Sequence, residues 1–458
     1  MITRMETISC MVFGYKFLMF LLIFLSSLLI PNIGDIIELS INGEIDAFQP
    51  PMNLSDSNYF ILFEGFTKWD SQYFVFISRY GYLTEKIFAF FPLWPLLLSF
   101  SNVVMGESLL LLLVWGTILN LLLACTITHT LISLVSEIYL ELKNKYIVII
   151  PFLLNPAGIF FHVFYSESLY LCLVLLATLK LIEGNDLCAA LFFHLASWTR
   201  ANGIVNSGFF LFAILVLTLK RRALSNLCNY LRLSVYVFIS VVPFALFQWY
   251  AFVKFCSKAG NISKSNYDIE IYLRKNQLFE EGVWCKEKLP VVYSYIQEKY
   301  WRNGFLRYYT LNNIPNFFLA IPLICFVPYI FWIHKKLITI TARAPIWAAK
   351  NMSRVDAIKF AALVQLAFLY AFSVLFMNIQ VMTRFIFSSC PIVYPTISKI
   401  VLDDMKIAKF NTNGLNFIQD IFSSRFRSLR LRTKLMIIWC ISYNILGLIL
   451  HPNRLPWT

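Results

Sequence analysis

The sequence predicts an all-α protein that crosses a membrane many times. Of its 458 residues, 59% are hydrophobic and only 14% are charged, whereas soluble domains carry about 25% charged residues. Continuous apolar runs such as Tyr15–Ile30, Ser108–Ile127 and Leu435–Leu450 are long enough to cross a hydrocarbon core of about 30 Å as helices. Strands of a membrane barrel would instead alternate polar and apolar residues. We therefore expect one multispanning helical domain over residues 1–458.

The first apolar run sets the orientation of the segments that follow it. It comes after Arg4 and Lys16, and the stretch "SLLIPNIGD" at its end offers no clean small-x-small cleavage site. We interpret the run as a retained signal-anchor, with a cleaved signal peptide as the alternative. Either way the next segment is translocated, and its charge agrees, since residues 32–107 contain nine acidic and three basic residues. We expect residues 32–107 to form a first luminal loop with interfacial helices.

Apolar residues within this loop recur at spacings of three and four, which predicts an amphipathic helix in the membrane interface. They are Leu62, Phe66, Trp69, Tyr73, Phe76 and Tyr80. The run Ile87–Phe100 is apolar enough to span, but Pro92 and Pro95 interrupt it. If it did span, the basic loops downstream would become luminal, so we interpret it as an interfacial or re-entrant segment.

The formal net charge of +14 comes mainly from short segments between the later apolar runs. Binding of nucleic acid would require a soluble basic face, whereas short basic loops are typical of the cytosolic side of membrane proteins. We therefore place residues 220–232, 334–356 and 402–434 in the cytosol. Alternation then places residues 254–312, a second large luminal loop, and the turn 378–384 in the lumen, together with the C-terminal "HPNRLPWT".

Between Ile147 and Leu219 the sequence leaves two interpretations open. Four closely spaced crossings would give about eleven transmembrane helices in all, and two would give about nine. Both preserve the sidedness of every later segment. No internal repeat is evident, which disfavours a transporter built from inverted halves.

Cysteines and glycosylation sequons carry weaker information about sidedness. The ten cysteines include no C-x-x-C pair and no histidine partners at zinc spacing. Most lie in apolar runs, but Cys256 and Cys285 fall in the second luminal loop, where the sequence leaves a disulfide between them open. The sequons at Asn53 and Asn261 lie on the predicted luminal side, whereas the sequon at Asn351 should go unused.

Five unusual polar residues reach the luminal side under this topology. They are Asp70, His162, Glu167, Arg200 and Arg384. Each has a purely structural interpretation as well: solvation, packing, helix capping, or snorkelling to phospholipid headgroups. Charged groups at membrane depth are costly and usually mark function. One acid that can act as a base and two guanidiniums that can hold a phosphate suit the transfer of a sugar from a lipid phosphate.

Six segments that follow one another from about residue 64 to the C-terminus resemble the GPI mannosyltransferase 2 family, phosphatidylinositol-glycan class V. They are "KWDSQYFVFISRYGY", "FAFFPLWPL", "NPAGIFFHVFYSESLY", "TRANG", "TRFIFSSCPIVY" and "LPWT". The resemblance implies a helical bundle like that of type C glycosyltransferases, in the endoplasmic reticulum membrane. It also implies transfer of the second mannose of the GPI precursor, α-1,6-linked, from dolichyl-phosphate-mannose. Fungal relatives of the family suggest a small accessory membrane subunit.

The resemblance further implies a catalytic acid in the first luminal loop, at the position of Asp70, with Glu64 as a neighbouring acid whose spacing departs from D-x-D. We expect Asp70 to be the general base on the 6-hydroxyl of the first mannose. Arg200 and Arg384 are expected to bind the departing phosphate on physical grounds. Glu167 is expected to orient the acceptor, and Trp69 to hold this loop where lipid phosphate meets water. A monophosphate donor needs no divalent clamp, so we expect neither metal nor cofactor.

Two alternatives remain open at this point. A lipid-linked substrate transporter or flippase also needs many helices and polar groups at lipid depth, although it would need access from both faces. Another luminal mannosyltransferase that uses dolichyl-phosphate-mannose would have the same composition, and only the family resemblance separates the two. The chain has no P-loop, dinucleotide, zinc-protease or esterase motif, so those chemistries lack support.

Overall fold

The computed structural model describes residues 2–30, 60–106, 108–140, 145–220, 227–256, 283–288, 290–407, 427 and 429–455. Within these ranges the chain forms α-helices and short 3-10 helices, and no β-strand. The predicted all-α membrane fold is therefore confirmed. The sequons at Asn53 and Asn261 lie outside the described residues.

Seven helical stretches of the described residues are long and apolar enough to cross a membrane, or eight if one bent pair counts as a span. They lie in α1 (Ile2–Leu29), α5 (Leu109–Ile138), η7 (Ala201–Ser207) with α9 (Gly208–Leu219), α10 (Leu227–Cys256), η11 (Leu311–Asn313) with α13 (Ile314–Ile333), α16 (Arg354–Phe376) and α20 (Leu431–Leu450). The bent pair consists of α17 (Met382–Ser389), with the turn before it, and α18 (Val393–Ile407), which meet at 86°. The chain is thus a multi-pass membrane protein.

The sequence predicted about nine to eleven crossings, and the difference arises between Ile147 and Leu219. Here the chain forms α7 (Glu167–Glu183) and α8 (Asp186–Thr199), joined by a turn at Gly184. These helices have 17 and 14 residues, or about 25 and 21 Å of length, and are too short to be counted among the seven. They still run between the two ends of the bundle, since Glu167 at the start of α7 pairs with Arg200 after α8, whereas Asp186 at the start of α8 pairs with Arg354 at the start of α16.

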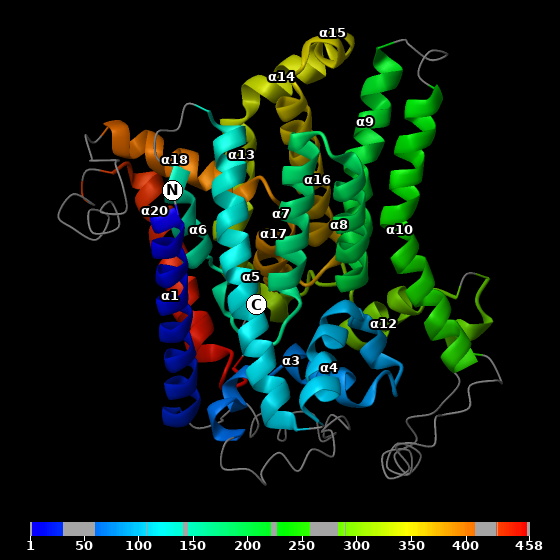
Figure 1. Cartoon of the computed structure of the whole chain (residues 1–458), viewed down its shortest axis with the longest axis vertical. Helices are drawn as coiled ribbons and strands as arrows, with labels where there is room; N and C mark the ends of the chain where they lie inside the picture. The colour runs from blue at the N-terminus through cyan, green and yellow to red at the C-terminus, as the bar shows by residue number, and fades with distance from the viewer. Residues whose placement is uncertain are drawn as a thin grey trace.

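The described loops sort to two ends of the bundle, as the charge pattern predicted. α14 (Lys335–Arg343) and α15 (Pro345–Asn351) lie at one end, near the last turn of α9 and the first turn of α10 (Figure 1). We call this the basic end. At the opposite end lie α3 (Asp70–Tyr80), α4 (Leu93–Met105) and α12 (Val292–Trp301), and we call it the Asp70 end (Figure 1).

The predicted amphipathic helix over residues 62–80 is shorter than expected and begins at Asp70. Two 3-10 turns, η2 (Phe60–Leu62) and η3 (Glu64–Phe66), precede it. Trp69 has a positive φ of 54° with ψ −134°, and an α-helix, whose φ is about −63°, cannot continue through such a residue. This break separates the start of α3 from η3.

The run interrupted by two prolines does not form a long span. α4 begins directly after Pro92 and has 13 residues, fewer than the roughly 20 that a crossing needs. It packs against α3 at the Asp70 end. This placement agrees with the interfacial or re-entrant segment predicted there.

Part of the second predicted luminal loop is attached to the same end. Cys256, the last residue of α10, forms a disulfide with Cys285 in η10 (Val283–Lys286). The neighbouring Trp284 is fully buried, and its indole N–H donates to Glu85 Oε2 at 3.0 Å. Lys299 of α12 lies 3.1 Å from the other oxygen of Glu85. These contacts hold α12 against the segment that links α3 to α4.

α7 lies inside the bundle, and its packing fixes the direction of its first side chain, Glu167. It packs against α5, α8, α16 and α17, and most of its side chains are buried. Its first residue, Glu167, faces the Asp70 end and is 1% exposed. Because α7 is well packed, the Glu167 side chain has little freedom to turn away from this end.

Candidate active site

A cavity of about 290 Å³ lies at the Asp70 end. Its walls come from the start of α3, the start of α7, the link between α8 and η7, α12, α17 and the segment after α20. The candidate residues Trp69, Asp70, Glu167, Arg200 and Arg384 all line it. Asp70 and Arg384 are 314 residues apart in the chain and in direct contact in the fold. The structure therefore brings together the polar groups that the topology had placed on one side.

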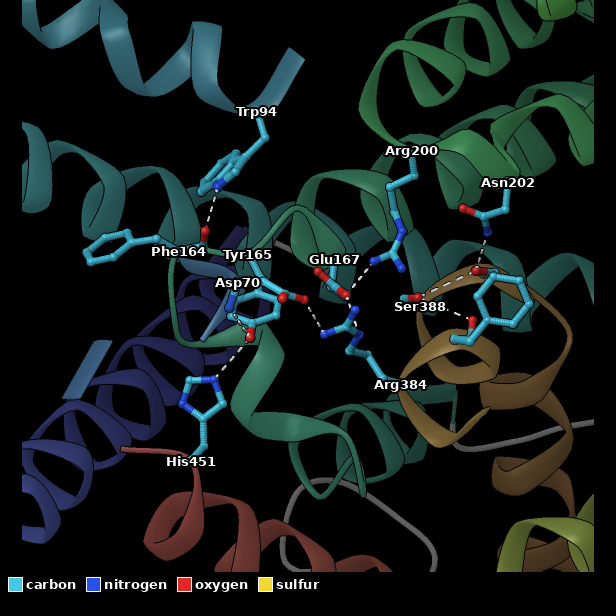
Figure 2. A network of polar contacts seen from close by, with 12 residues as sticks. Asp70, Trp94, Phe164, Tyr165, Glu167, Arg200, Asn202, Arg384, Ser388 and His451 are labelled. Atoms are coloured by element: carbon cyan, nitrogen blue, oxygen red, sulfur yellow. Dashed lines mark hydrogen bonds and ion pairs between the residues drawn. The ribbon is translucent and has the colours of Figure 1, made fainter. Parts of the chain in front are cut away.

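Four of these side chains form a continuous row of ion pairs (Figure 2). Arg384 Nη1 donates to Asp70 Oδ2 at 2.9 Å, and Arg384 Nε lies 3.1 Å from Glu167 Oε1. Glu167 Oε1 is also paired with Arg200 Nη1. Burying a carboxylate costs free energy unless opposite charges replace its hydration. The two arginines supply that compensation, and the row of two acids and two bases is electrically balanced.

The ends of three helices deliver these groups. Asp70 is the first residue of α3, and Glu167 is the first residue of α7. The partial positive charge of a helix N-terminus favours a carboxylate at that position. Arg200 is the residue at which α8 ends, in an extended backbone conformation, whereas Arg384 lies within α17. The row is therefore built on helices, which hold side chains more firmly than loops do.

The row of ion pairs still has capacity to bind a ligand. The side chains of Asp70 and Arg384 are 24% and 17% exposed, although both line a cavity. Within the described residues, neither oxygen of Glu167 accepts a hydrogen bond, because its contacts with the arginines are ion pairs without hydrogen-bond geometry. A hydroxyl or phosphate that enters the cavity can reach both charge types.

Tyr165 and His451 support Asp70 and were not identified from the sequence. The backbone N–H of Asp70 donates to Tyr165 Oη at 3.0 Å, and His451 Nε2 lies 3.4 Å from the same oxygen (Figure 2). The Arg384 guanidinium carbon lies 5.0 Å from the Phe160 ring centre and 5.3 Å from that of Tyr165, a cation–π geometry. Tyr165 and His451 both lie in segments that the sequence placed on the luminal side. Residue type alone, however, does not indicate that a tyrosine or a histidine near the C-terminus contacts Asp70.

The protonation states of these two residues follow from burial. Burial raises the pKa of Tyr165 well above its usual value, and the negative charge of Asp70 adds to this effect. Burial lowers the pKa of His451 to about 3, and the positive charge of Arg384 contributes. At neutral pH Tyr165 is therefore a protonated phenol and His451 is a neutral imidazole. Neither adds charge to the balanced row.

Glu64 and His162 lie outside the cavity lining. Glu64 in η3 is paired with Lys68 Nζ at 2.8 Å, and the His162 ring lies 5.6 Å from that of Tyr15. Glu64 is close to Asp70 in sequence, but Trp69, with its positive φ of 54°, separates the two local structures. The structure thus does not bring the second predicted acid into the site.

Neutral polar and aromatic side chains make up much of the remaining lining. They include Tyr293, Gln297, Trp301, Asn303, Asn378 and Gln380. Amides can donate and accept hydrogen bonds at once, which suits sugar hydroxyls. Within the described ranges, no group of three or more His, Cys, Asp or Glu side chains is arranged to hold a metal. The cavity thus combines a carboxylate that can act as a base, two guanidiniums that can bind an anion, and a wall of amides that can bind hydroxyls.

Comparisons with known proteins agree with this chemistry. Residues 4–458 match the family model described as Mannosyltransferase (PIG-V). The chain is 32% identical to the GPI alpha-1,6-mannosyltransferase 2 of Cricetulus griseus, over 90% of this chain and 92% of that protein. It is 31% identical to the protein of the same name from Homo sapiens, with the same coverage. It is also 33% identical to the GPI mannosyltransferase 2 of Schizosaccharomyces pombe, over 61% of this chain and 56% of that protein.

Solved structures offer only a distant likeness. The crystal structure of the Archaeoglobus fulgidus oligosaccharyltransferase superposes with a TM-score of 0.39 at 10% identity, covering 83% of this chain and 51% of that chain. That score is too low to assign a shared fold.

Proposed function

Because the chain belongs to the PIG-V family of mannosyltransferases, we propose that the cavity at the Asp70 end is its active site. The protein is a membrane-embedded GPI α-1,6-mannosyltransferase, and its substrates therefore include glycolipids. The family assignment favours this function over the transporter and over an unrelated luminal mannosyltransferase, the two alternatives that remained after sequence analysis.

The donor that fits the site is dolichyl-phosphate-mannose, which carries a single phosphate. Arg200 and Arg384 both line the cavity, and both pair with the same oxygen of Glu167, Oε1. Two neighbouring guanidiniums can bind one phosphate together, because each presents several N–H donors in one plane. Their charge stabilises the phosphate as it leaves, which is when the stabilisation accelerates the reaction.

Asp70 is the proposed general base. Its carboxylate takes the proton from the 6-hydroxyl of the acceptor mannose as that oxygen attacks the anomeric carbon of the donor. The new C–O bond forms while the bond from the anomeric carbon to the phosphate oxygen breaks, so a β-linked donor gives an α-linked product. Dolichyl phosphate leaves with the electron pair. Contact with the phosphate draws Arg384 away from Asp70 and leaves the carboxylate free to accept the proton.

The other lining residues position the substrates. Tyr165 holds the backbone of Asp70, so it fixes the start of α3 without reacting. Glu167 keeps the two arginines in place, and its oxygens can accept hydrogen bonds from acceptor hydroxyls. Trp69 is 37% exposed at the cavity edge, where an indole is stable at the boundary between lipid and water. Glu64 takes no part, since it lies outside the lining.

The distribution of charge supports a luminal active site. The basic end carries the loops expected in the cytosol, and the cavity lies at the opposite end of the bundle. We assign the protein to the endoplasmic reticulum membrane, where a donor of this type would meet its acceptor on the luminal side. The reaction as written needs no metal ion. A small accessory membrane subunit is a further prediction, to be checked by purifying the protein from its native membrane.

The observation that carries the proposal is the contact between Asp70 and Arg384 at 2.9 Å inside the cavity. Asp70→Asn keeps the size of the side chain but removes the base, and should lower mannose transfer by about 10²- to 10⁴-fold. The assay is restoration of GPI-anchored proteins on the surface of cells that lack the enzyme, at matched expression. Glu64→Gln is the matched control and should restore them normally. Near-normal restoration by Asp70→Asn would rule out Asp70 as the base.

A further inference from the structure

A second cavity lies at the basic end of the molecule. A cleft of about 340 Å³ is bordered by α9, α10, α15 and α16. Along α9 its lining extends from Phe209 to Lys220, about 16 Å of helix. This is close to half of a hydrocarbon core of about 30 Å. The cleft therefore has the depth of the hydrocarbon layer of one membrane leaflet.

The interior of the cleft is apolar and its mouth is basic. The interior is formed by side chains such as Phe210, Phe212, Ala213, Val216, Leu217 and Ala361. At the mouth lie Lys220, Arg232, Arg354 and Asp186. Arg354 and Asp186 pair with each other, whereas Lys220 and Arg232 form no ion pair within the part of the chain that the structure describes. Two cations are thus left at the end of an apolar cleft.

We propose that this cleft binds an anionic glycerophospholipid, with its phosphate at Lys220 and Arg232 and one acyl chain along α9. Basic pockets between transmembrane helices on the cytosolic side are a recurrent form of recognition for anionic headgroups. A zwitterionic lipid would bring its own cation to a mouth that already carries two uncompensated positive charges. The positive charge of the mouth favours an anionic headgroup, and the length of the apolar interior fits one acyl chain. Both features therefore favour an anionic glycerophospholipid.

The lipid in this cleft is distinct from the substrates. No residue lines both the cleft and the cavity at the Asp70 end, and α15, which borders the cleft, lies at the opposite end of the bundle from α3 and α12, which border the cavity (Figure 1). A phosphate at Lys220 cannot reach Arg200 or Arg384. The acyl chain instead fills space between α9 and α16, which are in contact with each other. A ligand that binds only the folded state stabilises it, so the lipid should raise the melting temperature.

The test uses the full-length protein, purified in mild detergent and titrated with phosphatidylserine or phosphatidylcholine of identical acyl chains. Native mass spectrometry measures the bound fraction, and the melting temperature gives an independent readout. Lys220→Gln with Arg232→Gln should weaken phosphatidylserine binding about 30-fold, because each basic residue contributes a factor of about five to attraction for an anionic lipid. Phosphatidylcholine should bind weakly to wild type and to this variant alike.

Two further variants separate a defined cleft from general surface charge. Lys335→Gln with Lys336→Gln removes the same charge from α14 at the same end, outside the cleft lining, and should leave binding unchanged. Ala213→Trp keeps the basic mouth but fills the interior, and should abolish binding. If it fails to fold, Val216→Phe replaces it. Equal binding of both lipids to wild type, equal loss in the α14 variant, or full binding in the filled cleft would each overturn the proposal.

Discussion

Replacement of Arg384 by lysine separates geometry from charge in the active site. Arg384 reaches Asp70 Oδ2 with Nη1 at 2.9 Å and Glu167 Oε1 with Nε at 3.1 Å. Lysine keeps the positive charge but has one ammonium group, which cannot reach both carboxylates in the same way or bind a phosphate through a planar fork. The contacts of the guanidinium with the rings of Phe160 and Tyr165 are lost as well.

The expected loss is large because the proposed mechanism places Arg384 where charge develops on the departing phosphate. Removing one preorganised donor from such a site usually lowers the rate by about 10²- to 10³-fold. This corresponds to about 3–4 kcal/mol of transition-state stabilisation. Arg384→Ala should also destabilise the fold by about 3–5 kcal/mol, since breaking a buried ion pair leaves the partner charge uncompensated. The lysine variant should be folded and nearly inactive, and the alanine variant should be poorly expressed.

The assay is transfer of mannose in microsomes from cells that lack the enzyme, normalised to the amount of variant protein. Arg307→Lys is the matched control, because Arg307 pairs with Glu298 at the surface and both side chains are more than half exposed. A surface pair of this kind contributes less than about 1 kcal/mol, so this variant should behave like wild type. The prediction is a loss of at least about 100-fold in the rate of mannose transfer. If Arg384→Lys keeps more than about half of the wild-type rate, the planar guanidinium does not have the proposed role.

Three further predictions concern stability, pH and metal. Cys285→Ser removes the disulfide that links residues 29 apart, which should cost up to about 3–4 kcal/mol by loop entropy; wild-type protein with the same gel mobility with and without reductant would contradict the bond. The folded pKa of His451, about 3, lies below the unfolded value of about 6.5, so its contribution to stability is complete above pH 6.5 and is lost as pH falls. The melting temperature of His451→Gln should therefore fall less between pH 7 and pH 5 than that of wild type. Equal falls would count against the buried neutral imidazole. Transfer activity should survive EDTA; activity lost in chelator and regained with Mn²⁺ or Mg²⁺ would show that the site needs a metal.

The end of the bundle that each segment reaches was predictable, because it depends on parity and charge alone. Each crossing reverses the direction of the chain, so the acidic first loop and the basic later loops assign every segment to an end without any knowledge of packing. This reasoning placed Asp70, Glu167, Arg200 and Arg384 together. It left nine or eleven crossings open, and both counts assign these residues to the same end, because they differ by an even number.

The rotation of each helix about its axis and the packing between helices decided which groups each charged side chain contacts. Which face of α7 points to the cavity depends on contacts with α5, α8, α16 and α17, and no local pattern encodes those contacts. For that reason Glu167 was predicted to orient the acceptor and not to bridge two arginines, and Tyr165 and His451 were missed. Nearness in sequence suggested a shared role for Glu64 and Asp70, but Glu64 lies outside the cavity lining, and its role stays a prediction. Composition and charge order determine which end of a membrane bundle a residue reaches, whereas the long-range packing of helices determines what it touches there.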